Sequence, residues 1–355
     1  MRIVFDARSY FMRTGIARYT RGLAHALAAS PGRHQWLFLI SDHHQPDEIE
    51  FGSSAVEVRQ SHAPWLGGAF EREALAREAC AWSADLFHGV FPPHALATVP
   101  TITTVFDFSP LSHPDLHQEV VRSAFHDAWA SAQADAHGFI AVSSATAIEI
   151  RARAGATRPV WTIPCGLSAP FDVPPTGAED AERREGVLYV GTIEPRKNVV
   201  LLLEASRRLR DNGRRIPVTI IGKRGWGYEG FDTDLAATSD ATWLGFTDDE
   251  TLLGHYRRAA IAACPSVLEG FGLPTLEAMA QGALPLIAPD PALIQLVGRP
   301  DLAVPLEASA WATAIARWLD DRPGLELAVQ ATRATAQQYR WSAIAEQCLP
   351  LYDAF

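Results

Sequence analysis

The sequence has few lysines and cysteines, and it has no long apolar run. Only two of its 31 basic residues are lysines, Lys197 and Lys223, and the rest are arginine. Its four cysteines lie far apart in the chain, which argues against a zinc site or a disulfide framework. No apolar stretch reaches the roughly 18 residues that a membrane-spanning helix needs. The N-terminus (MRIVFDARSY) does not have the pattern of a signal peptide, so we expect a cytoplasmic protein.

The sequence also lacks an excess of positive charge, since its formal net charge is -10. This balance argues against extended nucleic-acid binding, which needs a basic surface, and it weakens any electrostatic anchor to an anionic membrane. Two arginine-rich segments, at residues 207–210 and 214–215, fit either a membrane-facing patch or a solvated helix face. The solvated face is the simpler interpretation.

Short apolar runs alternate with helical stretches along most of the chain. They occur at residues 3–5, 36–40, 56–58, 86–88, 101–106, 139–142 and 160–163, and again at 187–190, 218–221, 241–244, 261–263 and 284–287. Such alternation is typical of parallel sheets with helices on both faces. We therefore predict an α/β protein with two doubly wound, Rossmann-like domains, residues 1–168 and 187–340. The Pro-, Gly- and charge-rich stretch at 169–186 is expected to link them.

Helix boundaries in the second domain can be predicted from capping signals. A helix over residues 199–212 is closed by Gly213. Another, over residues 247–259, is opened by Thr247 and Glu250, which are three apart as in a capping box. Ligands of doubly wound sheets bind beyond the carboxyl ends of the strands, so the segments that follow predicted strands are the candidate sites.

The first such segment contains Gly15, at the start of a predicted helix. A glycine there lets backbone N–H groups approach an anion, and the helix dipole helps. A Gly-x-Gly-x-x-Gly turn would indicate a nicotinamide-dependent oxidoreductase, but residues 6–25 contain only Gly15 and Gly22. The sequence therefore disfavours that enzyme class.

The second segment, residues 189–198 (YVGTIEPRKN), places Arg196 and Lys197 where a helix is expected to begin. Positive side chains are unfavourable there because a helix N-terminus is itself positive. A diphosphate would offset this cost, since a guanidinium can bind two oxygens and an ammonium supplies a point charge. The alternative is an exposed pair that contacts solvent or nearby acids such as Glu194.

The third segment, residues 265–280 (PSVLEGFGLPTLEAMA), combines two carboxylates with two glycines. Glu269 precedes the glycines, and Pro274 and Glu277 are expected in the first turn of a helix. Carboxylates accept hydrogen bonds from the paired hydroxyls of sugars and riboses. The alternatives are a solvated acid at Glu269 and a favourable interaction of Glu277 with the helix dipole.

Together these segments resemble glycosyltransferase family 4, the retaining enzymes of the GT-B fold. The spacing of Glu269 and Glu277 within EGFGLPTLEAMA is the most specific match. The phrases GIARYT, YVGTIEPRKN, IGKRGW and WLGFTDDETLLGHYRRA follow in the expected order. The ending, YRWSAIAEQCLPLYDAF, resembles the terminal helix that crosses back to the first domain. The resemblance covers nearly the whole chain and is nearest to bacterial mannosyltransferases of surface-polysaccharide assembly.

This resemblance implies two domains facing across a cleft, with residues 341–355 as the returning helix. It implies metal-independent, retaining transfer of a hexose without a cofactor, and we find no Asp-x-Asp motif suited to Mg²⁺. The donor would be a nucleotide-diphosphate sugar, with mannose from GDP-mannose as our choice and a UDP-sugar as an alternative. The acceptor would be a glycan or lipid-linked glycan, which leaves open peripheral contact with the inner face of the cytoplasmic membrane.

The resemblance also assigns roles to single residues. Arg196 and Lys197 would hold the diphosphate, Glu269 the transferred sugar, and Asp107 would lie on the acceptor side. The implied donor-binding set is completed by Gly15, Gly222, Lys223, Gly270, Phe271, Gly272, Leu273 and Glu277.

Two departures from the family pattern stand out. Phe106 occupies a position where many relatives have histidine, and Thr192 occupies one where some have arginine. His88, His94 and His113 are candidate substitutes for the missing histidine, although each also fits a structural or peripheral role. The departures leave open a non-catalytic protein that binds sugar nucleotides.

Overall fold

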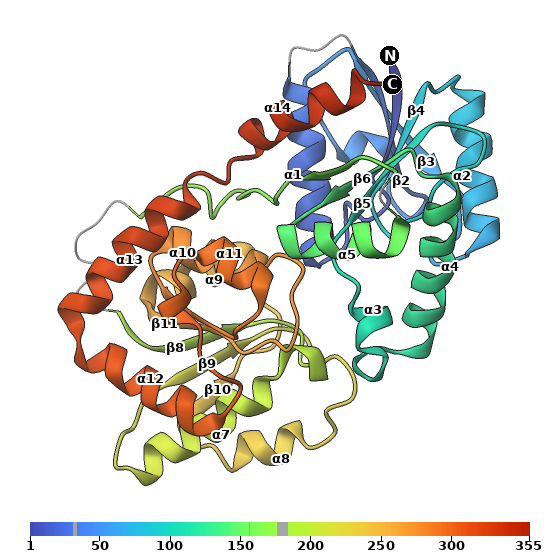
Figure 1. Ribbon diagram of the computed structural model, residues 1–355. Coiled ribbons are helices and arrows are strands. Elements are labelled where there is room, and N and C mark those ends of the chain that lie inside the picture. Colours follow the sequence, from blue (N-terminus) through green and yellow to red (C-terminus); the bar gives the residue numbers. More distant parts are fainter. Residues whose placement is uncertain (31–33, 156, 176–183) are drawn as a thin grey trace. The chain divides into compact units, whose positions relative to one another are not determined.

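The computed structural model describes residues 1–30, 34–155, 157–175 and 184–355 (Figure 1). By its internal contacts the chain forms two compact units. The first comprises Met1–Ser168 and Tyr339–Phe355, and the second comprises Ala169–Gln338. Each unit is described by itself below.

The first unit is built on a parallel sheet with the strand order β3-β2-β1-β4-β5-β6-β7. The strands are β1 (Arg2–Asp6), β2 (Gln35–Ser41), β3 (Val56–Ser61), β4 (Leu86–Gly89), β5 (Thr101–Val105), β6 (Gly138–Ala141) and β7 (Val160–Thr162). Its helices are α1 (Gly15–Ala29), α2 (Ala69–Ala81), α3 (Ser109–Ser112), α4 (Glu119–Asp135), α5 (Ser144–Ala154) and α14 (Trp341–Tyr352), with 3-10 turns η1 (Pro46–Glu48) and η2 (Pro114–Leu116). Each strand contains or overlaps one of the predicted apolar runs.

Alternating side chains of β1 pack on opposite faces of this sheet. Val4 lies in a core with Leu75 and Ala79 of α2. Phe5 faces the other way, where its ring contacts those of Phe38 and His88 edge-on. Tyr352 of α14 packs against the His88 ring on this side, so helices cover both faces of the sheet, as continuous apolar strands require.

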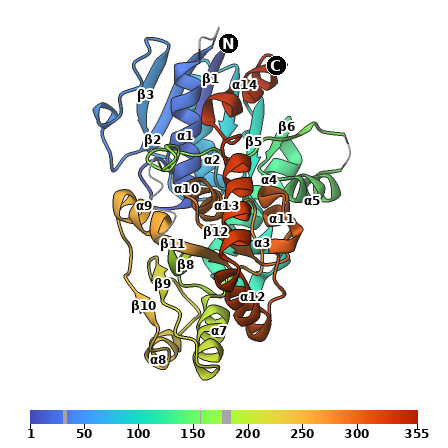
Figure 2. The same cartoon turned by 90° about the vertical axis from the view of Figure 1, so that its left-hand side faces the viewer.

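The C-terminal helix α14 lies against α1 (Figures 1 and 2). Glycine at position 22 of α1 makes this close approach possible, because a Cβ there would lie 2.0 Å from the Trp341 ring. A buried chain of hydrogen bonds adds to the packing. The Tyr352 hydroxyl is 2.8 Å from His88 Nδ1, and His88 Nε2 is 2.9 Å from Thr104 Oγ1. Burial lowers the pKa of His88 to about 3, so this imidazole is neutral.

The second unit has a parallel sheet with the strand order β10-β9-β8-β11-β12. Its strands are β8 (Glu185–Val190), β9 (Val218–Ile221), β10 (Ala241–Trp243), β11 (Ala259–Cys264) and β12 (Leu284–Ile287). Its helices are α7 (Val199–Asp211), α8 (Phe231–Ala236), α9 (Asp249–Arg258), α10 (Leu273–Gln281), α11 (Pro291–Val297), α12 (Ala308–Asp320) and α13 (Arg322–Ala336), with 3-10 turns η3 (Pro195–Lys197) and η4 (Pro300–Leu302).

One capping prediction is wrong. The N-cap of α9 is Asp248, whose side chain accepts the Thr251 N–H at 2.7 Å, and not Thr247. Aspartate is at least as good an N-cap as threonine, so the run Thr247-Asp248-Asp249 offers competing starts that spacing alone does not resolve.

The expected linker at residues 169–186 falls partly outside the described residues, namely at 176–183. Its beginning packs on the second unit, because the Gln281 side chain donates to the Phe171 carbonyl at 2.7 Å and Phe171 is buried. Its end overlaps β8. The domain boundaries drawn from the sequence stay a prediction.

Candidate active site

The second and third predicted segments follow adjacent strands of the second unit. β8 and β11 are paired in parallel, with Tyr189 opposite Ala263. The loops after these strands therefore leave the sheet at the same edge. The two loops are also joined directly, since Val267 N–H donates to the Arg196 carbonyl at 2.8 Å.

Arg196 and Lys197 lie in the 3-10 turn η3, just before α7. Arg196 binds Glu194 at 3.0 Å and donates to the Leu268 carbonyl at 3.0 Å. Lys197 Nζ lies 2.5 Å from Glu269 Oε1. The contact with Glu194 was part of the alternative interpretation, and it is present. The same interpretation expected the two cations to be exposed, and they are not. The side chains of Arg196 and Lys197 are only 15% and 16% exposed.

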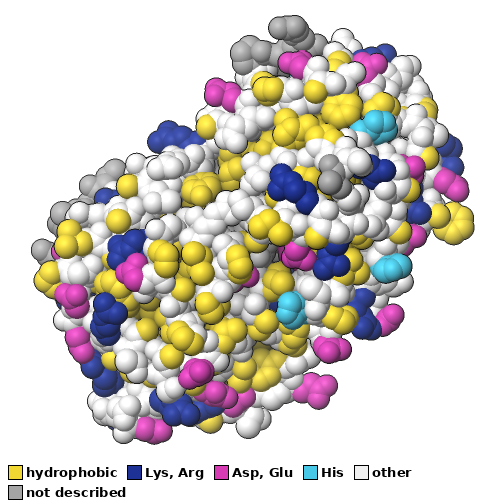
Figure 3. Space-filling model, viewed as in Figure 1, with side chains coloured by type: hydrophobic (Ala, Val, Ile, Leu, Met, Phe, Trp, Pro, Cys, Tyr) yellow, Lys and Arg dark blue, Asp and Glu magenta, His cyan; other side chains and the backbone are white. Residues whose placement is uncertain are grey.

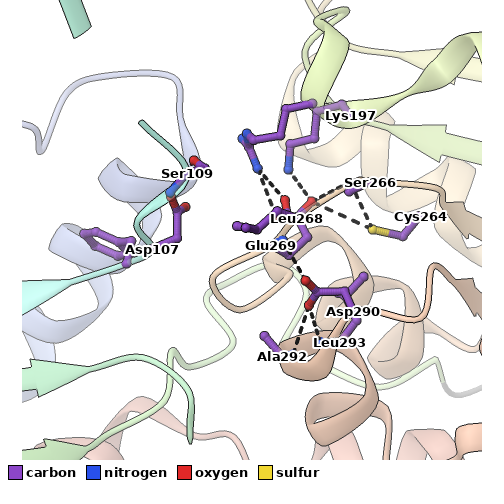
Figure 4. A network of polar contacts seen from close by, with 12 residues as sticks. Asp107, Ser109, Lys197, Cys264, Ser266, Leu268, Glu269, Asp290, Ala292 and Leu293 are labelled. Carbon is purple, nitrogen blue, oxygen red and sulfur yellow. Dashed lines mark hydrogen bonds and ion pairs between the residues drawn. The ribbon is translucent and has the colours of Figure 1, made fainter. Parts of the chain in front are cut away.

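Glu269 is the acid on which this cluster converges (Figure 4). Its Oε1 also accepts a hydrogen bond from Ser266 Oγ at 2.7 Å, and its Oε2 lies 3.5 Å from Arg196. Burial alone would raise the pKa of Glu269, but Lys197 and Arg196 outweigh it and lower the pKa to about 2. Glu269 is therefore a buried, ionised carboxylate rather than the solvated acid of the alternative interpretation.

The loop from Glu269 to α10 turns at Gly272, whose φ of 96° is in a region that favours glycine. Gly270, Phe271, Gly272 and Leu273 are all buried, and Pro274 lies in the first turn of α10 as predicted. The prediction that Glu277 also lies in the first turn is wrong. Because α10 begins at Leu273, Glu277 is in the second turn. Glu277 is buried and accepts the Tyr256 hydroxyl at 3.0 Å.

Gly222 and Lys223 follow β9 at the same end of the sheet. Gly222 has φ 151°, and a Cβ there would lie 1.9 Å from the Gly191 carbonyl oxygen. This close contact and the hydrogen bond from Ile193 N–H to the Lys223 carbonyl hold the loops after β8 and β9 together. The Lys223 side chain is exposed, so only its backbone is fixed by these contacts.

The two site candidates of the first unit are placed as follows. Gly15 is the first residue of α1, and the N-cap Thr14 accepts the Ala17 N–H with its side chain. Asp107 follows β5 and accepts both the backbone N–H and the hydroxyl of Ser109, at 2.8 and 2.6 Å. These bonds fix the Asp107 carboxylate in the turn that leads to α3.

Two of the three candidate substitutes for the family histidine, His88 and His94, are fully buried. Phe106 contacts the Tyr19 ring edge-on. His88 is part of the buried chain with Tyr352, and burial lowers the pKa of His94 to about 3. His113 is close to the Ser112 hydroxyl, at 3.0 Å.

Two residues of the site are absent from the sequence prediction, Ser266 and Asp290. Asp290 accepts the Glu269 N–H at 3.3 Å and also caps α11. An Asp-Pro pair after a strand is a recognisable helix start. The sequence gives no local signal that the other carboxylate oxygen of Asp290 accepts the N–H of Glu269, 21 positions earlier.

Among the described residues, no group of three or more His, Cys, Asp or Glu side chains could hold a metal ion. The tripeptide Asp232-Thr233-Asp234 does have the form Asp-x-Asp. It lies in α8, where Asp232 pairs with Arg224 and Asp234 pairs with Arg207.

The arginine-rich segments at 207–210 and 214–215 are largely paired with acids. Arg207 binds Asp234, Arg210 binds Asp240 and Arg214 binds Asp320. On the face shown in Figure 3, basic and acidic side chains are interspersed. Among the described residues no helix is long and apolar enough to cross a membrane. The pairing agrees with the solvated helix face.

Two family models match the chain. Residues 13–169 match "Glycosyltransferase Family 4", and residues 178–338 match "Glycosyl transferases group 1". The structural comparison defines the fold as GT-B. Sucrose-phosphate synthase from Thermosynechococcus elongatus superimposes with a TM-score of 0.80 at 21% identity, covering 100% of this chain and 98% of the other. The protein belongs to glycosyltransferase family 4.

Two further proteins are similar to this chain. HepE of Anabaena, solved in complex with UDP and glucose, has a TM-score of 0.72 at 19% identity, and each chain is covered over its full length. The O-antigen chain mannosyltransferase B of Escherichia coli is 35% identical over 170 residues, which are 46% of this chain and 45% of that protein. The chain spans less than half the length of the first curated relatives that it matches.

Proposed function

We propose that this protein is a retaining hexosyltransferase that binds a nucleotide-diphosphate sugar on the second unit. One observation carries the proposal. Among the described residues Lys197 Nζ has one partner, Glu269, whereas an ammonium has three N–H donors. Two donors thus remain on a side chain that is 16% exposed. A phosphate group is a suitable acceptor for them.

The charge distribution supports the same role. A buried ion pair adds little net stability, because desolvation of both charges offsets their attraction. Stability therefore does not explain why Glu194, Arg196, Lys197 and Glu269 are concentrated at the end of a sheet. A ligand with both negative charges and hydroxyls does explain it. Arg196 and Lys197 would hold the diphosphate, and Glu269 would accept hydrogen bonds from the transferred hexose.

The remaining donor contacts follow the family pattern. Backbone N–H groups of residues 270–273 would lie beside the sugar, Glu277 would bind the ribose, and Gly222 and Lys223 would contribute from the loop after β9. Gly15 would add backbone contacts, and Asp107 would serve the acceptor. Glu277 also accepts the Tyr256 hydroxyl, so a bound ribose would share this carboxylate with Tyr256.

The reaction would be a same-face displacement. The bond from the hexose C1 to the phosphate oxygen breaks, the bond from C1 to the acceptor oxygen forms, and the acceptor proton passes to the departing diphosphate. Lys197 and Arg196 would stabilise the charge that develops on that leaving group, and the protein would mainly orient the two substrates.

We further propose mannose from GDP-mannose as the donor and a glycan or lipid-linked glycan as the acceptor, in surface-polysaccharide synthesis. The E. coli relative named above supports mannose. HepE supports a UDP-sugar instead. Peripheral attachment at the inner membrane face is a further proposal, which would require charges other than the paired arginines of α7.

Calorimetry with GDP, UDP and ADP and their hexose conjugates tests the donor. We expect one nucleotide family to bind, with the sugar adding affinity. Transfer is then measured with that donor and a mannan or lipid-linked acceptor, and NMR of the new linkage reports the anomeric configuration. Retention supports the proposal, and inversion contradicts it. Donor binding without transfer to any acceptor supports the non-catalytic alternative, which Phe106 and Thr192 favour.

A further inference from the structure

Asp290 joins the loop of Glu269 to the first turn of α11. Its Oδ1 accepts the backbone N–H groups of Ala292 and Leu293, at 2.9 and 3.1 Å. Its Oδ2 accepts the backbone N–H of Glu269, at 3.3 Å. Figure 4 shows the carboxylate between these two parts of the chain. Asp290 is only 8% exposed, so water cannot easily replace these contacts.

Capping alone does not require aspartate at this position. Serine, threonine and asparagine cap helices about as well, each with one accepting oxygen. Asp290 uses one oxygen for the cap and the other for Glu269. Only a carboxylate offers two acceptors and no donor in this space.

The second carboxylate is electrostatically unfavourable beside the first. Burial raises the pKa of Asp290, and the negative charge of Glu269 acts in the same direction. The backbone N–H groups of Leu293, Glu269 and Ala292 oppose this rise. The arrangement therefore holds the main chain at Glu269 at the expense of repulsion between two acids.

We propose that Asp290 is a positioning residue for sugar recognition. Ser266 and Lys197 bind the Glu269 carboxylate, and Asp290 binds its backbone N–H, so that both ends of the Glu269 side chain are held in place. The inference rests on the proposed function, in which Glu269 binds the transferred hexose. A positioning role differs from a purely structural one because loss of Asp290 would weaken binding of the sugar and not of the nucleotide.

The test variant is Asp290→Asn, which has nearly the same shape. Its carbonyl oxygen can still cap α11, but its NH₂ group then faces the Glu269 N–H, donor against donor. The control is Asp248→Asn. Asp248 caps α9 in the same unit through Thr251 and, among the described residues, makes no hydrogen bond to the Glu269 loop.

The readout is the affinity for GDP and for GDP-mannose, or for UDP and UDP-glucose if the protein selects uridine, together with kcat and KM for the donor. Loss of one buried hydrogen bond to the loop should reduce kcat/KM about tenfold. GDP affinity should stay within about twofold, because the cations are unchanged, while the gain from the sugar falls. Asp248→Asn should match the wild type in all these values.

Two results would overturn the inference alone, in a protein that transfers hexose normally. One is Asp290→Asn with wild-type kcat/KM and donor affinity. The other is an equal loss of affinity for nucleotide and sugar nucleotide, which would mark Asp290 as a helix cap only. A wild-type protein that binds no sugar nucleotide would overturn the proposed function, and the inference with it.

Discussion

Lys197 and Glu269 form an ion pair of 2.5 Å between residues 72 positions apart in the chain. The pair connects the loop after β8 with the loop after β11. It brings the cations of one predicted segment to the acid of another, and among the described residues Glu269 is the one partner of the Lys197 ammonium.

Replacing Lys197 by Met should reduce hexose transfer by about 10²–10³-fold, because one group that stabilises the leaving diphosphate is lost. Steady-state kinetics with the selected donor measure this effect. Arg214→Met is a matched control, since Arg214 forms an exposed pair with Asp320. Transfer by Lys197→Met at the control's rate would remove Lys197 from the mechanism.

The charge state of Glu269 predicts a pH-dependent stability. Its pKa falls from an ordinary 4.5 to about 2 in the folded protein, which means that folding favours the ionised over the neutral acid by about 3 kcal/mol. Because the folded pKa is the lower one, this stabilisation is present above pH 4.5 and is lost as the pH falls toward 2.

Urea unfolding of the wild type and of Glu269→Gln at several pH values tests this. The stability advantage of the wild type should shrink between pH 4.5 and 2, while groups that do not interact with Glu269 titrate alike in both proteins. An advantage that is constant over that range would mean that Glu269 is not the buried, ionised acid described above.

Gly222→Ala should destabilise the second unit by roughly 2–4 kcal/mol, from an unfavourable φ together with overlap on the Gly191 carbonyl. Gly213→Ala is the matched control. It also has a positive φ, of 77°, but nothing lies within 4 Å of its added Cβ. We expect a cost of about 1 kcal/mol there. Equal costs in thermal unfolding would show that the contact between the two loops is not tight.

Tyr352→Phe should cost about 1–3 kcal/mol, since it leaves a buried imidazole nitrogen of His88 without its partner. Tyr10→Phe removes a similar bond to His25, at 2.7 Å, but in a partly exposed place. Its cost should stay below about 1 kcal/mol because water can replace the hydroxyl. A chemical unfolding curve measures both, and the reverse order would contradict the role given to the buried chain.

The fold is predictable from the sequence because its signals are local. Each strand carries its own apolar run, and the Gly-Pro pattern around Leu273 marks the start of α10. The N-cap of α9 shows the limit, since Thr247 and Asp248 compete at neighbouring positions. An error of one residue at a helix end changes the cap but not the topology.

Three charged residues of the candidate site, and the contact of Arg196 with Glu194, could be proposed from the sequence, whereas the contacts made by Glu269 could not. Arg196, Lys197 and Glu269 could be found because charged residues after buried strands are conspicuous. The pairing of Lys197 with Glu269, and the contact of Asp290 with Glu269, depend on which strands are neighbours in the sheet. The sequence pattern predicts parallel strands without their order, so these contacts required the structure.

The most direct test of the central claim is a crystal structure of the protein with its nucleotide diphosphate bound. The account predicts phosphate oxygens within hydrogen-bond distance of Lys197 Nζ and of the Arg196 guanidinium, with Glu269 facing the hexose when the full donor is used. A nucleotide bound elsewhere, with Lys197 still paired with Glu269 and Arg196 still bound to Glu194 and the Leu268 carbonyl, would contradict it.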